Sequence, residues 1–360
     1  MTYGRNIKKL LALLTAAAIL FLCGCSDGGN DNEASAIPAD SGSAIIVTPL
    51  PHDGTASPTP ETDRPTDRPE VSEVPATETP ATEVPTEADP TEHAAVKLAI
   101  DTSKLRSKTV LLKDIDTGEV LYSLAADTHI YPASLTKIMT GLLAAEMLDP
   151  NGAYEITKEA VDIADSMGAS TAGFNAGEVT NKDGILGGIL LSSAAECTIT
   201  AAINIAGSQD AFVELMNKRA AEMGLCNTHF VNCIGLHNAE HYTTAEDLMI
   251  LTEAALGNQE FVRFFTLDTM KAVTEPARQY QLTLISTVFS ALDAYDFGNV
   301  SILGGKTGYT RQAGLCLATY ALYKDHHYVL IVAANDGNKD TEKYHFIDTA
   351  YVYGVLQEAL

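Results

Sequence analysis

The chain has 360 residues and a formal net charge of −24 at pH 7, with 47 Asp and Glu against 23 Lys and Arg. This acidic balance argues against nucleic acid as a partner, because phosphate backbones are bound by clustered Lys and Arg. A chain of this length can hold one large domain together with targeting and linking segments.

The first 25 residues have the pattern of a targeting signal. Three basic residues precede an apolar run over 10–22, which is shorter than the roughly 20 residues of a membrane span and typical of a signal-peptide core. The run ends in Leu22-Cys23-Gly24-Cys25, which resembles a bacterial lipobox, so we expect Cys25 to be lipidated. Cleavage slightly later, or an uncleaved anchor, are the alternatives. All three place the rest of the chain outside the cytoplasm.

Residues 26–95 are predicted to be a disordered linker rich in Pro, Thr and Glu. They contain eleven of the fourteen prolines, no aromatic residue, and fifteen acidic residues against two Arg. Such a composition cannot bury enough apolar surface to offset the entropy of ordering. Proline and charge repulsion keep the segment extended, so it acts as a long spacer between an anchor and a domain.

Residues 96–360 are predicted to form the folded domain. A turn at Asp116-Thr117-Gly118 between two apolar runs predicts a hairpin near its start. Helices are expected at 131–148, 194–206, 210–223, 241–258 and 341–358, and strands at 301–310, 314–325 and 326–336. Ser208, and Thr243 or Thr244, are the expected helix caps. Strands at both ends predict an α+β domain whose terminal strands share one antiparallel sheet.

Within this domain, Ser134 lies three residues before Lys137 at the start of an expected amphipathic helix. Residues three apart on a helix share a face, so the hydroxyl and the amine are neighbours. A serine hydroxyl becomes a nucleophile when a base takes its proton, and a lysine with a lowered pKa can be that base. An isolated Ser-x-x-Lys is usually a capping serine beside a solvated lysine, so the pair needs support from elsewhere.

A second motif, Lys306-Thr307-Gly308, lies in the expected strand GGKTGYT. Glycine inside a strand often marks a place where a ligand backbone approaches closely. Such a strand can pair with an extended peptide and present a cation and a hydroxyl to it. An edge strand protected by lysine is the alternative interpretation.

The two motifs together, with GFNAGEV, ILLSSAAECT and THFVNCIGLHNAEHYTTAEDL between them in order, resemble the low-molecular-mass D-alanyl-D-alanine carboxypeptidases among the penicillin-recognising serine enzymes. The resemblance covers nearly all of 96–360. It implies a five-stranded antiparallel sheet flanked by helices, with a helical region beside it. It implies no cofactor and no metal.

The resemblance assigns three catalytic roles. Ser134 would attack the penultimate D-Ala carbonyl of a peptidoglycan stem peptide and form an acyl-enzyme, with Lys137 as the general base. Ser193 would relay the proton to the departing D-Ala. β-Lactams would acylate the same serine.

The resemblance also assigns substrate contacts to the second motif. Lys306 and Thr307 would hold the terminal carboxylate, Gly308 would leave room beside the pocket, and the N–H groups of Ser134 and Tyr309 would form the oxyanion hole. We expect a monomeric enzyme, attached to the cell membrane by its N-terminal lipid.

Three departures from the family pattern limit the assignment. Ala195 stands where the second motif has Asn, and Glu196 follows it. No arginine is found between Asn335 and Lys343 to assist carboxylate binding, so Lys339 or Lys343 would replace it. The β-rich C-terminal domain of many relatives is not expected after 360, and the N-terminal lipid would replace their terminal anchor.

Other interpretations remain open. A β-lactamase, an endopeptidase or transpeptidase, and a weakly active penicillin-binding lipoprotein share the same motifs. Cys226 and Cys233 could form a disulfide outside the cell, against the alternative of buried free thiols. His237 and His241 could suggest zinc, but no third ligand follows at suitable spacing.

Overall fold

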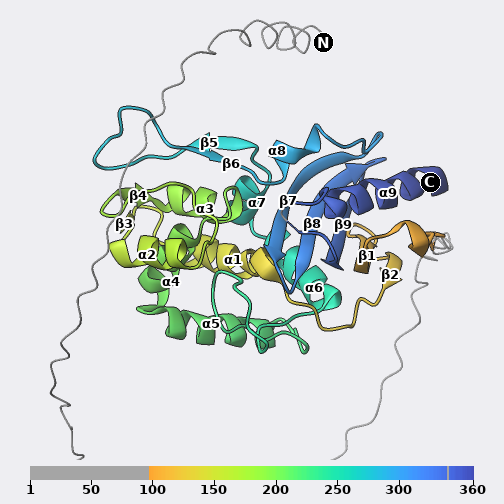
Figure 1. Ribbon diagram of the computed structural model, residues 1–360, viewed down its shortest axis with the longest axis horizontal. Coiled ribbons are helices and arrows are strands. Elements are labelled where there is room, and N and C mark those ends of the chain that lie inside the picture. Colours follow the sequence, from red (N-terminus) through yellow and green to blue (C-terminus); the bar gives the residue numbers. More distant parts are fainter. Residues whose placement is uncertain (1–96, 339) are drawn as a thin grey trace, which may run out of the picture. The chain divides into compact units, whose positions relative to one another are not determined.

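The computed structural model describes residues 97–338 and 340–360 (Figure 1). The expected signal peptide (1–25), the expected linker (26–95) and Cys25 lie outside the described residues. Within the described part, every helix is too short or too polar to cross a membrane.

The strands form one large sheet and two small ribbons. The members of the large sheet are β1 (Ser107–Asp114), β2 (Val120–Leu124), β7 (Ser301–Thr310), β8 (Gly314–Tyr323) and β9 (His326–Asn335). The members of the two ribbons are β3 (Ala153–Glu155) with β4 (Val179–Asn181), and β5 (Thr269–Lys271) with β6 (Thr283–Ile285).

The helices lie mostly between β2 and β7 in the sequence. They are α1 (Lys137–Met147), α2 (Lys158–Ser166), α3 (Lys182–Leu190), α4 (Ala195–Ala206), α5 (Gln209–Glu222), α6 (Ala245–Leu256), α7 (Gln259–Phe265), α8 (Phe289–Leu292) and α9 (Tyr344–Ala359). The short 3₁₀ turns η1 (Thr102–Lys104) and η2 (Ala133–Thr136) complete the described elements.

The large sheet confirms the predicted fold class. Its order is β2-β1-β9-β8-β7, and all neighbours are antiparallel. The N-terminal hairpin therefore joins the C-terminal strands through the β1–β9 pair, as the sequence predicts. β7, which carries the Lys306 motif, is the edge strand, so one of its sides is free of strand pairing.

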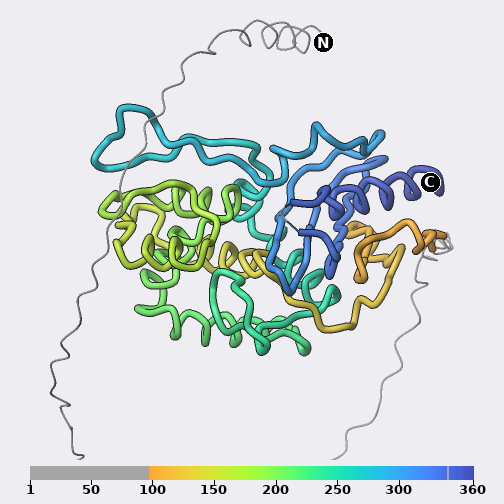
Figure 2. Tube along the Cα trace, in the orientation of Figure 1, coloured from red at the N-terminus to blue at the C-terminus, as the bar shows by residue number. Residues whose placement is uncertain are grey.

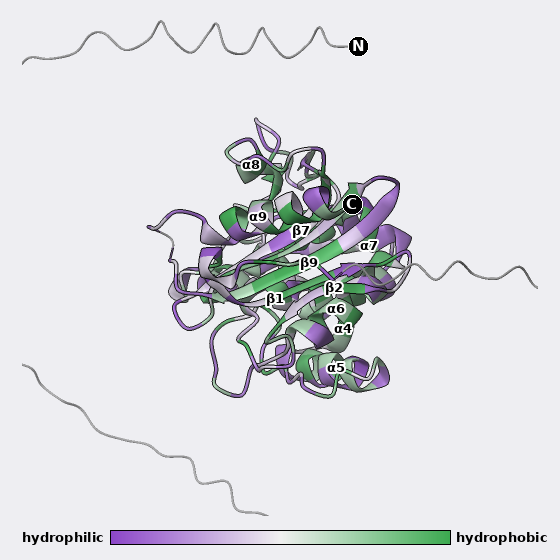
Figure 3. Ribbon diagram, turned by 90° about the vertical axis from the view of Figure 1, so that its right-hand side faces the viewer, coloured by the Kyte–Doolittle hydropathy of each residue, from purple (hydrophilic) through white to green (hydrophobic). Residues whose placement is uncertain are grey.

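Both faces of the sheet are covered, which makes a three-layer α+β arrangement. On β9, Val329 and Ile331 belong to the large core shared with the helical region, whereas Leu330 and Val332 belong to a second core with α9. Alternate residues of a strand point to opposite faces, so β9 is apolar along most of its length (Figure 3). This central burial fixes the register of the strands that carry the site.

Several helix boundaries agree with the sequence. Ser208 caps α5 by accepting from the Ala211 N–H, and Thr244 caps α6 by accepting from the Asp247 N–H. The amphipathic character predicted for α1 is wrong. Nine of its eleven residues are buried, because α1 passes through the middle of the helical region (Figure 1).

A long loop between β5 and β6 runs beside the helical region (Figure 2). Glu275 pairs with Val179 of β4, and the Arg278 guanidinium makes an ion pair with Glu178. The Arg278 guanidinium also donates to the Gly173 carbonyl at 2.7 Å. This loop therefore fastens the segment that follows α2.

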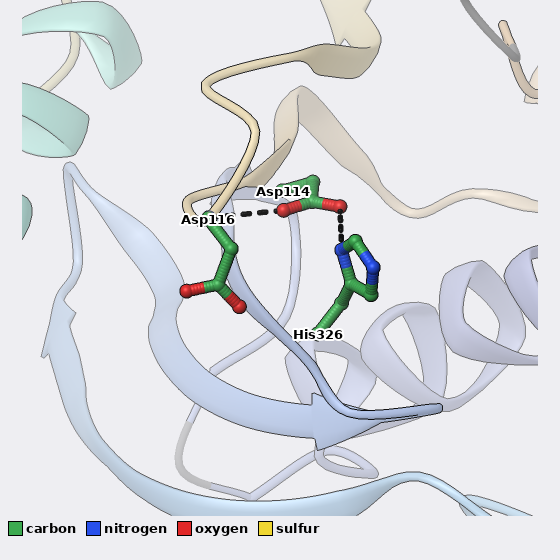
Figure 4. A group of neighbouring side chains, drawn as sticks. All are labelled: Asp114, Asp116 and His326. Atoms are coloured by element: carbon green, nitrogen blue, oxygen red, sulfur yellow. Dashed lines mark hydrogen bonds and ion pairs between the residues drawn. The ribbon is translucent and has the colours of Figure 1, made fainter. Parts of the chain in front are cut away.

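Two turns of the large sheet are joined by a cluster of polar side chains (Figure 4). Asp114 accepts from His326 Nδ1 at 2.7 Å through one oxygen, and from the Asp116 N–H at 3.0 Å through the other. The candidate ligand atoms of these three residues lie within 4.8 Å of one another. Both Asp114 oxygens are already engaged, so we assign the cluster to joining the β1–β2 and β8–β9 turns.

Candidate active site

Ser134 and Lys137 are neighbours, but on a different element from the one predicted. Ser134 lies in the 3₁₀ turn η2, and Lys137 is the first residue of α1. Residues three apart eclipse each other in a 3₁₀ turn, so the adjacency survives. Lys137 Nζ donates to Ser134 Oγ at 3.3 Å. Ala133, just before the serine, has φ 47°, a left-handed conformation that strains a residue with a side chain.

The amine of Lys137 is buried, with only 2% of the residue exposed. Its Nζ also donates to the Ile234 carbonyl at 2.7 Å. Burial lowers the pKa of Lys137 to about 8, against the opposing influence of Cys233 and Glu196. A lysine with a pKa near neutrality can be unprotonated and still close to its serine, as a general base requires.

The Ile234 carbonyl is presented by a tight loop organised around Asn232. Asn232 Oδ1 accepts from the N–H groups of Ile234, Gly235 and Leu236 at 3.2, 2.7 and 3.0 Å. The Asn232 amide nitrogen donates to the Leu236 carbonyl at 2.9 Å. One side chain thereby fixes the loop whose carbonyl orients the lysine. No local pattern predicts this partner, because it lies 97 residues from Lys137 in the sequence.

His241 stabilises the turn η2 through a hydrogen bond to Thr136. Its Nδ1 accepts from the Val231 N–H at 3.1 Å, so the proton of the neutral ring sits on Nε2, which donates to Thr136 Oγ1 at 2.8 Å. Thr136 stands between Ser134 and Lys137 in η2 and α1. Both ring nitrogens are thus engaged in positioning the turn, and the idea of a zinc pair with His237 finds no support in this geometry.

We expect acidification to destabilise the protein through His241. Burial lowers its pKa to about 4 from 6.5. Between these values the unfolded chain binds a proton that the folded chain does not, so stability falls as pH falls from 6.5 to 4, by about 3 kcal/mol from this residue. Urea unfolding at several pH values would measure the fall, and His241→Gln should make it less steep, while buried His345, whose pKa is lowered to about 3, still contributes a fall of the same sign. An equally steep fall in His241→Gln would contradict the assignment.

Ser193 faces the same space from the segment before α4. It has φ 59°, and its Oγ is buried without a hydrogen-bond partner among the described residues. Ala195 is fully buried, and its N–H donates to the Ser170 carbonyl at 2.8 Å. A strained backbone with an unpartnered buried hydroxyl is common at catalytic positions, where a ligand completes the bonding.

β7 forms the opposite wall. A Cβ placed on Gly308 would lie 3.1 Å from the Ser134 N atom, so a side chain here would push on the backbone of the nucleophile, and glycine lets the strand pass close to it. The Thr307 hydroxyl donates to Thr287 Oγ1 at 2.8 Å, and the side chain of Tyr309 is partly exposed. Lys306 has 0% exposed and is not among the residues that line the cleft; its Nζ donates to the Thr307 carbonyl at 3.1 Å, and burial followed by repulsion from Lys137 lowers its pKa well below the usual value.

These walls enclose a cleft of ≈ 630 Å³. The predicted site residues Ser134, Lys137, Ser193, Thr307, Gly308 and Tyr309 all line it. Lys343, at the start of α9, and His237 line it as well. Its described lining carries the cations Lys137 and Lys343 and no carboxylate, which suits an anionic ligand. Lys339, the other lysine considered from the sequence, lies outside the described residues.

The four described cysteines are free thiols. Cys197, Cys233 and Cys316 are buried, and Cys226 is exposed. The possible Cys226–Cys233 disulfide is therefore not formed in this structure. Burial raises the pKa of Cys233 and of Cys316 to about 12, so neither thiol supplies a thiolate near neutral pH.

The sequence was compared with families of known proteins. The model of the D-alanyl-D-alanine carboxypeptidase family, peptidase family S11, matches residues 94–337. The chain belongs to this family. D-alanyl-D-alanine carboxypeptidase DacF of Bacillus subtilis is 34% identical over 226 residues, which are 61% of this chain and 56% of that protein. A D-alanyl-D-alanine endopeptidase of Pseudomonas aeruginosa is 28% identical over 59% of this chain and 66% of its own length.

Solved structures agree with the family assignment. A single-residue variant of Streptomyces K15 DD-transpeptidase superimposes with a TM-score of 0.63 at 25% identity, over 71% of this chain and 98% of that one. The chain spans a little over half of the length of the first curated relatives, 56% and 59%. The resemblance predicted from the motifs is thereby confirmed at the level of family and fold.

Proposed function

We propose that this protein is a serine D-alanyl-D-alanine carboxypeptidase that removes the terminal D-Ala from peptidoglycan stem pentapeptides and is inhibited by β-lactams. The observation that carries the proposal is the 3.3 Å contact between Ser134 Oγ and a buried Lys137 amine whose pKa is about 8. Family membership, and relatives whose names include D-alanyl-D-alanine carboxypeptidase, support the substrate class.

The proposed reaction has two balanced steps. Lys137 takes the Ser134 proton as Oγ bonds to the penultimate D-Ala carbonyl carbon, with the Ser134 and Tyr309 N–H groups stabilising the oxyanion. The carbon–nitrogen bond then breaks, and Ser193 passes the proton to the departing D-Ala. Water hydrolyses the resulting ester and releases the free serine. No cofactor or metal is needed in this scheme.

The terminal carboxylate would bind along β7. Thr307 offers a hydroxyl, and Gly308 leaves space beside Ser134. Lys306 of β7 is fully buried and would contribute through its position beside the Thr307 carbonyl, whereas Lys343 lines the cleft itself and would replace the arginine that assists carboxylate binding in many relatives. An extended substrate would add to the free edge of β7.

We also propose that the chain consists of a lipoprotein signal (1–25), a linker (26–95) and the catalytic domain (96–360), with lipidation at Cys25 and a location outside the cytoplasm. The signal and lipobox patterns and the composition of the linker support this arrangement. We expect the enzyme to act as a monomer.

Ala195 favours a second candidate. An Asn at this place would donate to the substrate amide, and its replacement by a buried methyl group can alter which acceptor resolves the acyl-enzyme. Relatives named as endopeptidase and DD-transpeptidase indicate the alternatives. A β-lactamase would in addition need fast deacylation.

The full chain should be incubated with a fluorescent penicillin, and separately with diacetyl-Lys-D-Ala-D-Ala. Stable labelling together with D-Ala release is the expected result. Labelling without release would favour a transpeptidase or a penicillin-binding lipoprotein, and rapid loss of label would favour a β-lactamase. Absence of both labelling and release would refute the proposal.

The rate of acylation should follow the protonation of Lys137. Because only the unprotonated amine accepts the serine proton, the rate should rise about tenfold per pH unit below about pH 8 and level off above it. Stopped-flow acylation between pH 5.5 and 9.5 would give the profile. A rate independent of pH across this range would exclude Lys137 as the base.

A further inference from the structure

Glu196 follows the altered position 195 and is among the most buried acids of the described chain, with 1% exposed. Its Oε1 accepts from the Ala172 N–H at 2.7 Å and from the Gly173 N–H at 3.2 Å. Its Oε2 is buried and has no hydrogen-bond partner among the described residues. A carboxylate is rarely buried in this way without a defined task.

The segment that donates hydrogen bonds to Glu196 forms one wall of the cleft. We define it as the wall segment, Met167–Phe174, of which residues 167–170 line the cleft. Residues 171–174 have no regular secondary structure, so hydrogen bonds from side chains are needed to hold their backbone in place. Glu196 holds Gly173 by its N–H, and Arg278 holds the same residue by its carbonyl at 2.7 Å.

Glu196 also acts on Lys137, the first residue of α1. Of the groups that influence Lys137, Cys233 is a thiol whose pKa is raised to about 12, so it is uncharged where the lysine titrates. Burial raises the pKa of Cys197, beside Glu196 on α4, well above its usual value. Lys306 lies buried on β7, where burial and then repulsion from Lys137 lower its pKa well below the usual value. Glu196 is the carboxylic acid in this set, and in its ionised form it raises the pKa of Lys137.

We infer that Glu196 is a positioning residue on α4, which packs against α1: it fixes the wall segment through Ala172 and Gly173, and its ionised carboxylate favours the ammonium form of Lys137. The inference rests on the proposed acylation of Ser134 for its kinetic consequence, but not for the anchoring of the wall. In a chain without Asn at 195, the acid at 196 would connect the second motif to the lysine and to the cleft wall together.

Two substitutions separate these effects. Glu196→Gln keeps an oxygen that can accept from both N–H groups but removes the charge. Glu196→Leu removes both the acceptor and the charge. Burial raises the pKa of Glu196 itself, so as pH falls its charge is lost at a higher pH than that of an exposed glutamate. Glu214→Gln, on the exposed side of α5, is the control for net charge.

The charge is tested by acylation of the full chain with fluorescent penicillin across pH. A negative neighbour favours the ammonium form of Lys137, so its removal should move the acid limb to lower pH. We expect a shift of at least about half a pH unit in Glu196→Gln, roughly a threefold faster reaction on that limb, and no shift in Glu214→Gln. An unchanged limb in Glu196→Gln would overturn the role of the charge.

The wall is tested by amide hydrogen exchange, which needs no activity. Ala172 and Gly173 should exchange faster in Glu196→Leu, whereas Glu196→Gln should stay close to the wild type. Equal exchange in all variants would overturn the anchoring role. If the wild type failed to react with penicillin, the proposed function would fail, and exchange together with a direct NMR titration of Lys137 would still decide the inference.

Discussion

Ser134→Ala is expected to abolish covalent labelling by penicillin and to reduce D-Ala release by at least about 10³-fold. The acyl-enzyme needs an oxygen at this position, and alanine offers none. In the described structure, the hydroxyl of Ser134 is contacted by the Lys137 amine at 3.3 Å. Its removal leaves the buried packing of η2 unchanged, so the thermal midpoint should shift by only a few degrees. Gel fluorescence and amino-acid release would measure both activities.

The matched control is Ser170→Ala. Ser170 also lines the cleft with a hydroxyl, but it lies on the wall segment away from Lys137's hydrogen bonds. This variant should keep its label. Labelling that persisted in Ser134→Ala and disappeared in Ser170→Ala would show that the nucleophile has been assigned to the wrong serine.

Local chemistry explains which parts of the site could be predicted from sequence. The neighbourhood of Ser134 and Lys137 could be predicted from their spacing, because residues three apart lie side by side in a 3₁₀ turn as they do in an α-helix. Hydroxyl side chains at Ser208 and Thr244 identified two helix starts by their capping bonds. The glycines in β7 were expected to mark the approach of a ligand backbone, which stays a prediction, and in the structure Gly308 lies close to the backbone of Ser134.

Long-range packing explains what could not be predicted. The carbonyl that orients Lys137 comes from Ile234, and no local pattern marks it. Lys306 was expected to hold a carboxylate directly, but its side chain is fully buried, and no feature of the motif predicts this burial. Helix α3 was missed because its three glycines lower helix propensity. A Cβ on Gly187 or Gly188 would meet Met270 or Cys197, so tertiary packing decides that element.

The alanine at position 195 and the loop that contains Ile234 both bear on the orientation of the buried Lys137 amine. A lysine without a polar partner would turn away from the serine or leave its protons unsatisfied. Here the Ile234 carbonyl, fixed through Asn232, accepts at 2.7 Å. The loop can therefore keep Lys137 in place although residue 195 is alanine.

Gly235→Ala is expected to be the most damaging conservative change in this loop. Gly235 has φ +85°, and a Cβ there would overlap the Ala133 carbonyl and lie 3.0 Å from the Ser134 N atom. Both contacts are with backbone, so either the loop or the nucleophile's turn must move. We expect a loss of about 3 kcal/mol or more in stability, since overpacking adds to left-handed strain. Acylation should fall by about 10²-fold or more, because small displacements of reacting groups cost that much.

Gly118→Ala is the control variant, because it introduces left-handed backbone strain without steric overlap. Gly118 has φ +78°, close to that of Gly235, but a Cβ there would meet nothing within 4 Å. This variant should lose only the 1–2 kcal/mol of a left-handed alanine and should acylate at the wild-type rate. Urea unfolding and penicillin acylation of both variants would make the comparison. Equal stability and equal rates would mean that the close approach of Gly235 to the turn of Ser134 does not constrain the site.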